Sequence, residues 1–321
     1  MLVSIVIPVK NGLKWLHKSL PVFLNQKIEG EFEIIILDSG STDGLQLFLK
    51  DNNFKNVSLI DIESNSFNHG LTRNVGVKFA KGKYVVLTVQ DAKPIDINWL
   101  QEMLNGFIDD EVMAVCGQQI VPHEHDKNPV QWFRPISKGG MKRCQFTKVE
   151  FSLMSKFNKK LYSSFDNVTA CYRREALLKI PFDELFFAED AQWSYNALQR
   201  GWAIVYNTNA RVEHYHHLFG DYTMNRILSE WYSTFLIFGI FPSKPSNVTL
   251  VSLLSWIKTI WKSKPYDFYY LFEWLRYNFY IHKSRRKAYF YWCKMNSTQE
   301  LFRQLEWDLK NNIAIGDEKK S

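Results

Sequence analysis

Cysteine is scarce in this 321-residue chain, and its four cysteines lie far apart. Cys116, Cys144, Cys171 and Cys293 form no CxxC pair, which argues against both a zinc cage and a disulfide framework. We also expect no secretory leader, because the apolar residues 1–9 pass directly into predicted structure without a cleavage site. We therefore expect reduced thiols and a cytoplasmic protein.

An excess of positive charge is absent from the first two thirds of the chain. Residues 1–222 contain 25 basic and 25 acidic side chains, whereas residues 223–321 contain 15 basic and 8 acidic ones. The last third is also rich in Trp and Tyr, and its longest nearly uncharged stretch, 231–242, is about half of the ~20 residues that a spanning helix requires. This composition favours a segment lying on an anionic membrane surface, at the cytoplasmic face.

Two other interpretations of the last third stay open. Its aromatic side chains also suit the core of a helical subdomain, and different helix faces can serve both purposes. Nucleic acid is a competing partner, because aromatic rings stack on bases, but we do not favour it.

Short β-branched runs alternate with helical patterns in the first part of the chain. Strand, helix, strand repeats form parallel sheets with helices on both faces. The fold class is therefore an open, mostly parallel α/β sheet. The predicted strands are 2–9, 32–41, 56–62, 83–91 and 112–121, and the predicted helices are 12–26, 72–80 and 98–108.

The alternation stops at residues 122–165, which are polar and which we expect to form a long functional loop. Order returns with a predicted helix at 190–201 and a strand at 203–207. The expected parts are residues 1–121 and residues 122–222, together one domain, followed by a mainly helical segment at 223–321.

Polar residues follow the predicted strands, and ligands of open α/β sheets bind outside the carboxyl ends of the strands. No GxGxxG follows the first strand and no GxxxxGK[ST] occurs, so the dinucleotide and P-loop interpretations lose their main support. Taken alone, DSGSTDG is also a good turn and helix cap. The candidate ligand-binding residues are Pro8, Val9, Lys10, Asn11, Asp38, Ser39, Asn68, His69, Gly70, Arg73, Gln90 and Asp91.

Five motifs in order resemble the family-2 glycosyltransferases of the GT-A fold. They are SIVIPVKN, IIILDSGSTD, RNVGVKFAKGKYVVLTVQDA, FAEDAQWSYNALQRG and VEHYHH, and the resemblance covers residues 1–220. Within that family, FNHGLTRN together with TVQDA is most similar to the rhamnosyltransferases. The resemblance implies inverting transfer of L-rhamnose from dTDP-L-rhamnose to an acceptor sugar of a bacterial surface polysaccharide or a lipid-linked glycan. It also implies that residues 1–121 bind the nucleotide sugar and that residues 122–222 form the acceptor and catalytic part. The acceptor would be contacted by the irregular segment and by the last third.

The resemblance also implies a divalent cation. The family's Asp-x-Asp motif reads Gln90-Asp91-Ala92 here, which leaves Asp91 as the one carboxylate. One carboxylate with donor phosphates and waters can hold Mg²⁺. His214 or His216 is the further ligand that the resemblance implies, and imidazole would favour Mn²⁺. Two histidines at i and i+2 lie on one side of an extended backbone, and histidines bonded to the backbone are the alternative.

Catalysis is expected from the acidic pair Glu189 and Asp190. Inverting transfer needs a carboxylate that accepts the proton of the acceptor hydroxyl. The family pattern assigns this base to the second acid, Asp190, and Glu189 is the alternative. Repulsion between the two carboxylates would raise the pKa of one of them, although both also suit the start of a helix.

The leaving diphosphate needs a positive charge, for which Arg73 is the candidate. A guanidinium and a helix N-terminus both favour phosphate. An ion pair of Arg73 with Asp91 or Asp38 is the alternative.

The segment FNHGLTRN, residues 67–74, is predicted as a donor-site loop. Gly70 would permit close backbone approach, and Thr72 would cap the following helix. Asn68 and His69 then have no structural role, which makes them candidate sugar or phosphate contacts.

Two other functions stay open. The same fold with a UDP-hexose or UDP-N-acetylhexosamine donor is the first, because nothing around Asp38 separates thymine from uracil. A non-catalytic carbohydrate-binding or scaffolding protein is the second. Gln90 favours it, whereas Asp91, Asp190 and His214 oppose it.

Overall fold

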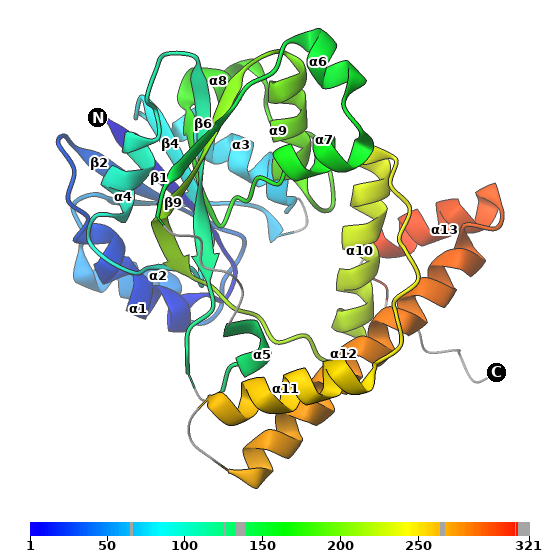
Figure 1. Cartoon of the computed structure of the whole chain (residues 1–321). Coiled ribbons are helices and arrows are strands. Elements are labelled where there is room, and N and C mark those ends of the chain that lie inside the picture. Colours follow the sequence, from blue (N-terminus) through cyan, green and yellow to red (C-terminus); the bar gives the residue numbers. More distant parts are fainter. Residues whose placement is uncertain (65–66, 125, 133–138, 264–266, 312, 314–321) are drawn as a thin grey trace. The chain divides into compact units, whose positions relative to one another are not determined.

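The chain forms two compact units. The computed structural model describes residues 1–64, 67–124, 126–132, 139–263, 267–311 and 313 (Figure 1).

The first unit is an α/β unit of residues 1–120 and 136–214, and the second is a helical unit of residues 121–135 and 215–321. The helical unit thus includes 121–135 and 215–222, which the sequence pattern had grouped with the catalytic domain.

A mixed sheet forms the centre of the α/β unit, with nine strands in the described part of the chain. The strand order is β3-β2-β1-β4-β8-β6-β9-β5, and β7 also pairs with β9. All five strands predicted for the first 121 residues are present, so the predicted open α/β sheet is confirmed. The strands are β1 (Val3–Val9), β2 (Phe32–Asp38), β3 (Val57–Asp61), β4 (Tyr84–Thr88), β5 (Lys93–Pro94), β6 (Val112–Ile120), β7 (Met141–Cys144), β8 (Thr169–Arg173) and β9 (Ala203–Glu213).

Helices cover both faces of this sheet. The predicted helices are confirmed, with ends that differ by one to three residues. The helices of the α/β unit are α1 (Leu13–Leu24), α2 (Leu45–Asn52), α3 (His69–Phe79), α4 (Trp99–Asn105), α6 (Lys148–Leu153), α7 (Lys156–Tyr162), α8 (Arg174–Lys179) and α9 (Glu189–Gln199).

Alternate residues of the central strands enter two hydrophobic clusters. Ile5 and Ile7 belong to one cluster and Val6 to the other, because successive side chains of a strand point to opposite faces. Helices α1, α2 and α4 complete the first cluster, and α3, α6, α8 and α9 complete the second. Burial on both faces explains why the strands are continuous apolar runs in the sequence.

The middle of the sheet contains an antiparallel strand that was not predicted. β8 lies between β4 and β6 and pairs antiparallel with both. The four strands β3, β2, β1 and β4 are parallel to one another. All five residues of β8 are buried, so the short run TACYR has no alternation that would reveal it.

The expectation of an irregular segment at 122–165 is wrong for residues 141–162. They contain β7, α6 and α7, and both helices are capped by side chains at their N-termini. Thr147 and Glu150 form a capping box, and Ser155 caps α7. Helices this short lie below the length at which apolar periodicity is informative. Residues 125 and 133–138 of the segment lie outside the described residues.

The helical unit is built around its longest helix, α12. Helices α10, α11 and α13 pack against α12, and Ile260 of α11 joins a small core with Tyr270, Trp274 and Tyr277. In the part of the chain that the structure describes, no helix combines the length and apolar character required to cross a bilayer. The helices are α5 (Pro129–Trp132), α10 (Gly220–Phe238), α11 (Leu250–Lys262), α12 (Phe268–Met295) and α13 (Gln299–Lys310).

Candidate active site

The topology of the sheet brings the candidate residues to one edge. β6 is antiparallel to β8, β8 is antiparallel to β4, and β6 is parallel to β9. β4 and β9 therefore run in the same direction, and their carboxyl ends meet at one edge, where Asp91 and His214 follow them. β8 runs the opposite way, so Asn167, which precedes it, lies at the same edge. Lys93 of β5 lies opposite Glu213 of β9, so the segment that follows Asp91 is held beside the end of β9.

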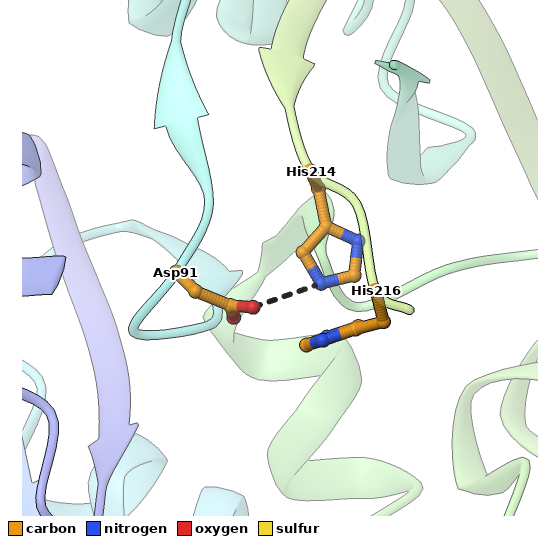
Figure 2. A group of neighbouring side chains, drawn as sticks. All are labelled: Asp91, His214 and His216. Atoms are coloured by element: carbon orange, nitrogen blue, oxygen red, sulfur yellow. Dashed lines mark ion pairs between the residues drawn. The ribbon is translucent and has the colours of Figure 1, made fainter. Parts of the chain in front are cut away.

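Asp91, His214 and His216 form a group that can hold a metal ion (Figure 2). One ligand atom from each residue lies within 4.8 Å of the others. Asp91 Oδ2 and His214 Nε2 are 3.6 Å apart, which is longer than a hydrogen bond. His216 follows two residues after His214 on the same extended stretch. The predicted metal ligands are thus neighbours in the structure.

Gln119 fixes the orientation of the His214 ring. His214 Nδ1 and Gln119 Oε1 are 2.7 Å apart, and because the amide oxygen only accepts, Nδ1 carries the proton and donates it. Nε2 is then the unprotonated nitrogen, the form in which imidazole binds a metal. The amide nitrogen of Gln119 donates in turn to Asp166. A carboxylate and two imidazoles with such support fit a hard to borderline divalent ion.

Asp190 is a carboxyl group with a strongly shifted pKa. It lies in the first turn of α9, whose N-cap residue Ala188 has a φ of 65°. Its Oδ2 accepts a hydrogen bond of 3.0 Å from the backbone N–H of Asn167, and its side chain is partly buried. Burial, followed by the charges of Glu189 and Asp166, raises the pKa of Asp190 to about 8. A carboxyl that titrates near neutral pH is suited to general base catalysis.

Glu189 is buried and paired, unlike its neighbour. Its Oε1 lies 2.5 Å from Arg73 Nη1 and accepts a 3.1 Å hydrogen bond from Asn167 Nδ2. Burial raises the pKa of Glu189, but the charge of Arg73, assisted by His69, overcomes this and lowers it below the ordinary value. The two adjacent acids therefore have pKa values pushed apart, with Glu189 as the permanent anion.

The position of Arg73 corrects one sequence expectation. Its guanidinium pairs with Glu189 rather than with Asp91 or Asp38, and the residue is only 3% exposed. An arginine this buried and committed to a carboxylate acts on the site through Glu189. Sequence reasoning missed this partner because the two residues are 116 positions apart.

The loops after β1 and β2 hold one another in place. Asp38 is fully buried, and its Oδ1 accepts hydrogen bonds from the backbone N–H and the hydroxyl of Ser41 at 2.9 and 2.6 Å. Ser39 is fully buried and donates to the carbonyl of Val9. The bonds between Asp38 and Ser41 are those of a turn, which agrees with the turn interpretation of DSGSTDG, whereas the bond from Ser39 to Val9 joins the two loops.

Other candidate residues of these loops are more accessible. Lys10 and Asn11 are exposed, whereas Pro8 and Val9 are buried in β1. Asn11, at φ 50°, accepts a 2.8 Å hydrogen bond from the backbone N–H of Thr42. Gln90 Oε1 accepts a 2.9 Å hydrogen bond from the backbone of Lys10, which links the β4 end to the β1 loop. The residue that replaces the family's first carboxylate thus has a structural role.

The start of α3 corrects the roles predicted for residues 67–74. Asn68 is the N-cap: its Oδ1 accepts a 3.0 Å hydrogen bond from Leu71 N, and its Nδ2 donates to Leu185 O at 2.8 Å. Thr72 is buried inside the helix and caps nothing. Asn68 therefore has a structural role, contrary to expectation.

Gly70 and His69 differ in their surroundings. A Cβ at Gly70 would lie 2.6 Å from the carbonyl of Asp183, so the close approach that glycine permits here is to the protein's own backbone. His69 is exposed at the N-terminus of α3, with its ring 5.0 Å from that of Phe67. His69 stays a candidate donor contact.

Three residues of the site were missed by sequence reasoning. Gln119 orients His214, Asp166 accepts from Gln119 and raises the pKa of Asp190, and Asn167 binds both acids of the pair. Gln119 stands near the carboxyl end of a predicted strand, which is the one signal that would have found it. Asp166 and Asn167 precede the unpredicted β8, so no pattern marked them.

The fold and this site define an α/β enzyme of the GT-A type, with a carboxyl group of raised pKa and candidate metal ligands at one edge of the sheet. The model of the family described as glycosyl transferase family 2 matches residues 4–180. The chain belongs to this family and is a glycosyltransferase.

Two curated relatives are similar over most of the chain. The O-antigen chain rhamnosyltransferase RfbN of Salmonella typhimurium is 29% identical over 238 residues, which are 73% of this chain and 71% of the relative. The O-antigen chain rhamnosyltransferase WbaN of Salmonella anatum is 32% identical over 240 residues, 72% of this chain and 70% of the relative. The predicted similarity to rhamnosyltransferases is confirmed.

A solved structure supports the fold. The mannosyltransferase PcManGT of Pyrobaculum calidifontis, determined in complex with GDP-Man and Mn²⁺, aligns with a TM-score of 0.55 and 14% identity. The alignment covers 95% of this chain and 78% of that protein. At this identity the comparison carries the fold alone.

Proposed function

We propose that the protein transfers L-rhamnose from dTDP-L-rhamnose, with inversion, to an acceptor sugar of a bacterial surface polysaccharide or a lipid-linked glycan. The observation that carries this proposal is the similarity of this chain to two O-antigen chain rhamnosyltransferases over about 70% of each chain. The site geometry supports the chemistry, because one edge of the sheet joins a raised-pKa carboxyl to a group of oxygen and nitrogen ligands.

Asp190 is the proposed general base. In its ionised form the carboxylate accepts the proton of the acceptor hydroxyl while the oxygen attacks the anomeric carbon, and the bond to the nucleoside diphosphate breaks. The backbone amide of Asn167 holds Asp190 Oδ2. Glu189 stays ionised beside Arg73, so it keeps the pKa of Asp190 high without competing for the proton.

Asp91, His214 and His216 are the residues that would hold the divalent ion. A divalent ion held there, Mg²⁺ or Mn²⁺, would act as a Lewis acid and offset the charge of the leaving diphosphate. Each of the three residues places one ligand atom within 4.8 Å of the others, and Gln119 keeps His214 in the required tautomer. Lys10, Asn11 and His69 are exposed, and they are the proposed contacts for the donor.

A donor panel tests the assignment. The purified protein is incubated with Mn²⁺ or Mg²⁺ and with dTDP-rhamnose, UDP-glucose or UDP-N-acetylglucosamine, and release of the nucleoside diphosphate is measured. We expect dTDP-rhamnose to be consumed fastest. Turnover of a UDP-sugar without turnover of dTDP-rhamnose would reject the rhamnosyl donor and favour the alternative, a UDP-sugar donor. Donor binding without turnover, unchanged in Asp190→Asn, would favour the non-catalytic function.

We also propose that the helical unit docks on the anionic cytoplasmic face of a membrane. The helix α11 exposes Leu250, Val251 and Leu254, of which Val251 is 77% exposed, and it carries the exposed Lys258 and Lys262. Apolar side chains beside lysines suit a headgroup layer with negative charge.

Vesicle sedimentation tests this surface. The protein is mixed with vesicles of phosphatidylcholine alone or with added phosphatidylglycerol. We expect binding to the anionic vesicles and its loss in Val251→Ser combined with Lys258→Glu. Leu153→Ser is the matched control, because Leu153 is 81% exposed but lies on α6 of the other unit. Equal binding of wild type and double variant would refute this role of α11.

A further inference from the structure

The helical unit contains a pocket of its own, apart from the residues of the candidate active site. The pocket has a volume of about 670 Å³, and all its lining residues belong to the helical unit. Small-molecule sites usually measure about 300–1,000 Å³, so the size suits a short oligosaccharide. The residues that line it include Phe219, Glu273, Trp274, Arg276, Tyr277 and Tyr280.

Aromatic rings form a fixed wall of this pocket. The ring of His217 stacks on that of Trp274, with centroids 5.4 Å apart and planes at 16°, and on that of Phe219 at 5.4 Å and 27°. Tyr277 lies edge-on to Trp274 and to Phe219. The hydroxyl of Tyr277 accepts a 3.1 Å hydrogen bond from Leu218 N. The faces of aromatic rings are electronegative and attract the slightly positive C–H groups on the apolar face of a sugar ring.

Hydrogen bonds hold the rings of His217 and Tyr280 in place. The carbonyl oxygen of Asp126 accepts a hydrogen bond from His217 Nε2. Tyr280 donates to Thr223 Oγ1 at 2.8 Å, which ties α12 to the start of α10. A wall fixed in this way loses little conformational freedom when a ligand binds.

Charged groups lie beside the aromatic wall. Glu273 and Arg276 are three residues apart on α12, so they project from neighbouring positions of one helix face. Both are exposed, and within the described residues neither takes part in an ion pair or a hydrogen bond. A carboxylate accepts hydrogen bonds from hydroxyl groups and a guanidinium donates them to hydroxyl oxygens.

We propose that this pocket binds a neutral oligosaccharide and holds the acceptor glycan, a role that rests on the proposed function. Aromatic rings next to one carboxylate and one guanidinium match the alternation of C–H and O–H groups on a sugar. An isoprenoid or acyl chain would offer Glu273 and Arg276 no group for a hydrogen bond, whereas a sugar offers several. A phosphate would be repelled by Glu273 and by the nearby carboxylate of Asp126.

Ligand-observed NMR tests the proposal without catalysis. Saturation transfer from the full-length protein is measured to the methyl glycosides of rhamnose, galactose, glucose and mannose, with no nucleotide sugar present. We expect at least one glycoside to bind. Phe219→Ala and Glu273→Gln should each weaken that binding about tenfold, which corresponds to about 1.4 kcal/mol.

Two matched controls separate this site from others. Phe272→Ala removes a 71% exposed aromatic ring from the same helix outside the pocket, and Asp190→Asn changes the candidate active site. Both should bind the glycoside as the wild type does. Phe219 is itself 60% exposed, so its replacement should leave the thermal unfolding midpoint close to that of the wild type.

Several outcomes of the NMR experiment would contradict the proposed acceptor pocket. Binding that survives both pocket substitutions, or is lost equally in Phe272→Ala, would overturn the proposal, as would the absence of binding by every glycoside. None of these results depends on the donor, so they leave the rhamnosyl transfer to be judged by nucleotide release alone. Turnover of dTDP-rhamnose with no glycoside bound in the pocket would retain the proposed function and reject the acceptor pocket.

Discussion

The pKa of Asp190 predicts how the reaction depends on pH. Because burial and the charges of Glu189 and Asp166 raise this pKa to about 8, only about one Asp190 in ten is ionised at about pH 7. A general base acts in its ionised form, so kcat/KM should rise about tenfold per pH unit below about pH 7.5 and level off above about pH 8.5. An ordinary aspartate would give a flat profile over this range.

The substitution Asp166→Asn tests the electrostatic part of this argument. It keeps the shape of the side chain and removes one of the two carboxylates that raise the Asp190 pKa. Without that charge the midpoint of the profile should move to lower pH, by about one unit or less. The sign follows because the loss of a nearby negative charge favours ionisation of Asp190.

The assay is the initial rate of nucleoside diphosphate release at low donor concentration between about pH 5.5 and 9, with a fixed total concentration of Mn²⁺. Asp190→Asn is the control for the base itself and should lose about 10²- to 10⁴-fold in rate while the donor still binds in calorimetry. A flat wild-type profile, or a midpoint that moves upward in Asp166→Asn, would refute the assignment.

Three further predictions concern the supporting residues. Gln119→Ala should weaken metal binding about 10- to 100-fold by freeing the ring of His214, measured by Mn²⁺ titration; unchanged affinity would contradict this orienting role. Arg73→Met should lower the free energy of unfolding by about 3–5 kcal/mol, because it leaves Glu189 buried without its cation; urea denaturation measures this, and a loss under about 1 kcal/mol would count against the pair. Asn68→Ala should cost about 1 kcal/mol through the lost N-cap, and a urea midpoint equal to that of the wild type would disprove the cap.

The sequence was sufficient for the strands that are buried on both faces. The apolar runs of β1 and β2 are long and β-branched, and the helix between them has clear periodicity, so local pattern and tertiary structure agree. The short strand β8 was missed because it pairs antiparallel with two strands distant in the chain. The capped helices α6 and α7 were missed because they are too short to show a period.

In the loops, a role that depends on local hydrogen bonds was predicted correctly, whereas a role that depends on a distant contact was not. The turn formed by Asp38 was visible in the sequence, because the hydrogen bonds between Asp38 Oδ1 and Ser41 reach only three residues along the chain. The role of Asn68 was misjudged, because the predicted start of α3 was three residues late and its contact with Leu185 spans 117 residues. Helix ends depend on such distant contacts more than helix centres do.

The sequence by itself determined the kind of protein: the alternation of apolar strand runs with helical patterns indicated the α/β sheet, and the order of five short motifs indicated the glycosyltransferase family. It also supplied the identities of Asp91, Asp190, His214 and His216. Only the tertiary structure decided how these groups behave. The partner of Arg73, the tautomer of His214 and the raised pKa of Asp190 depend on distances and burial between segments far apart in the chain, and no local pattern of residues encodes them.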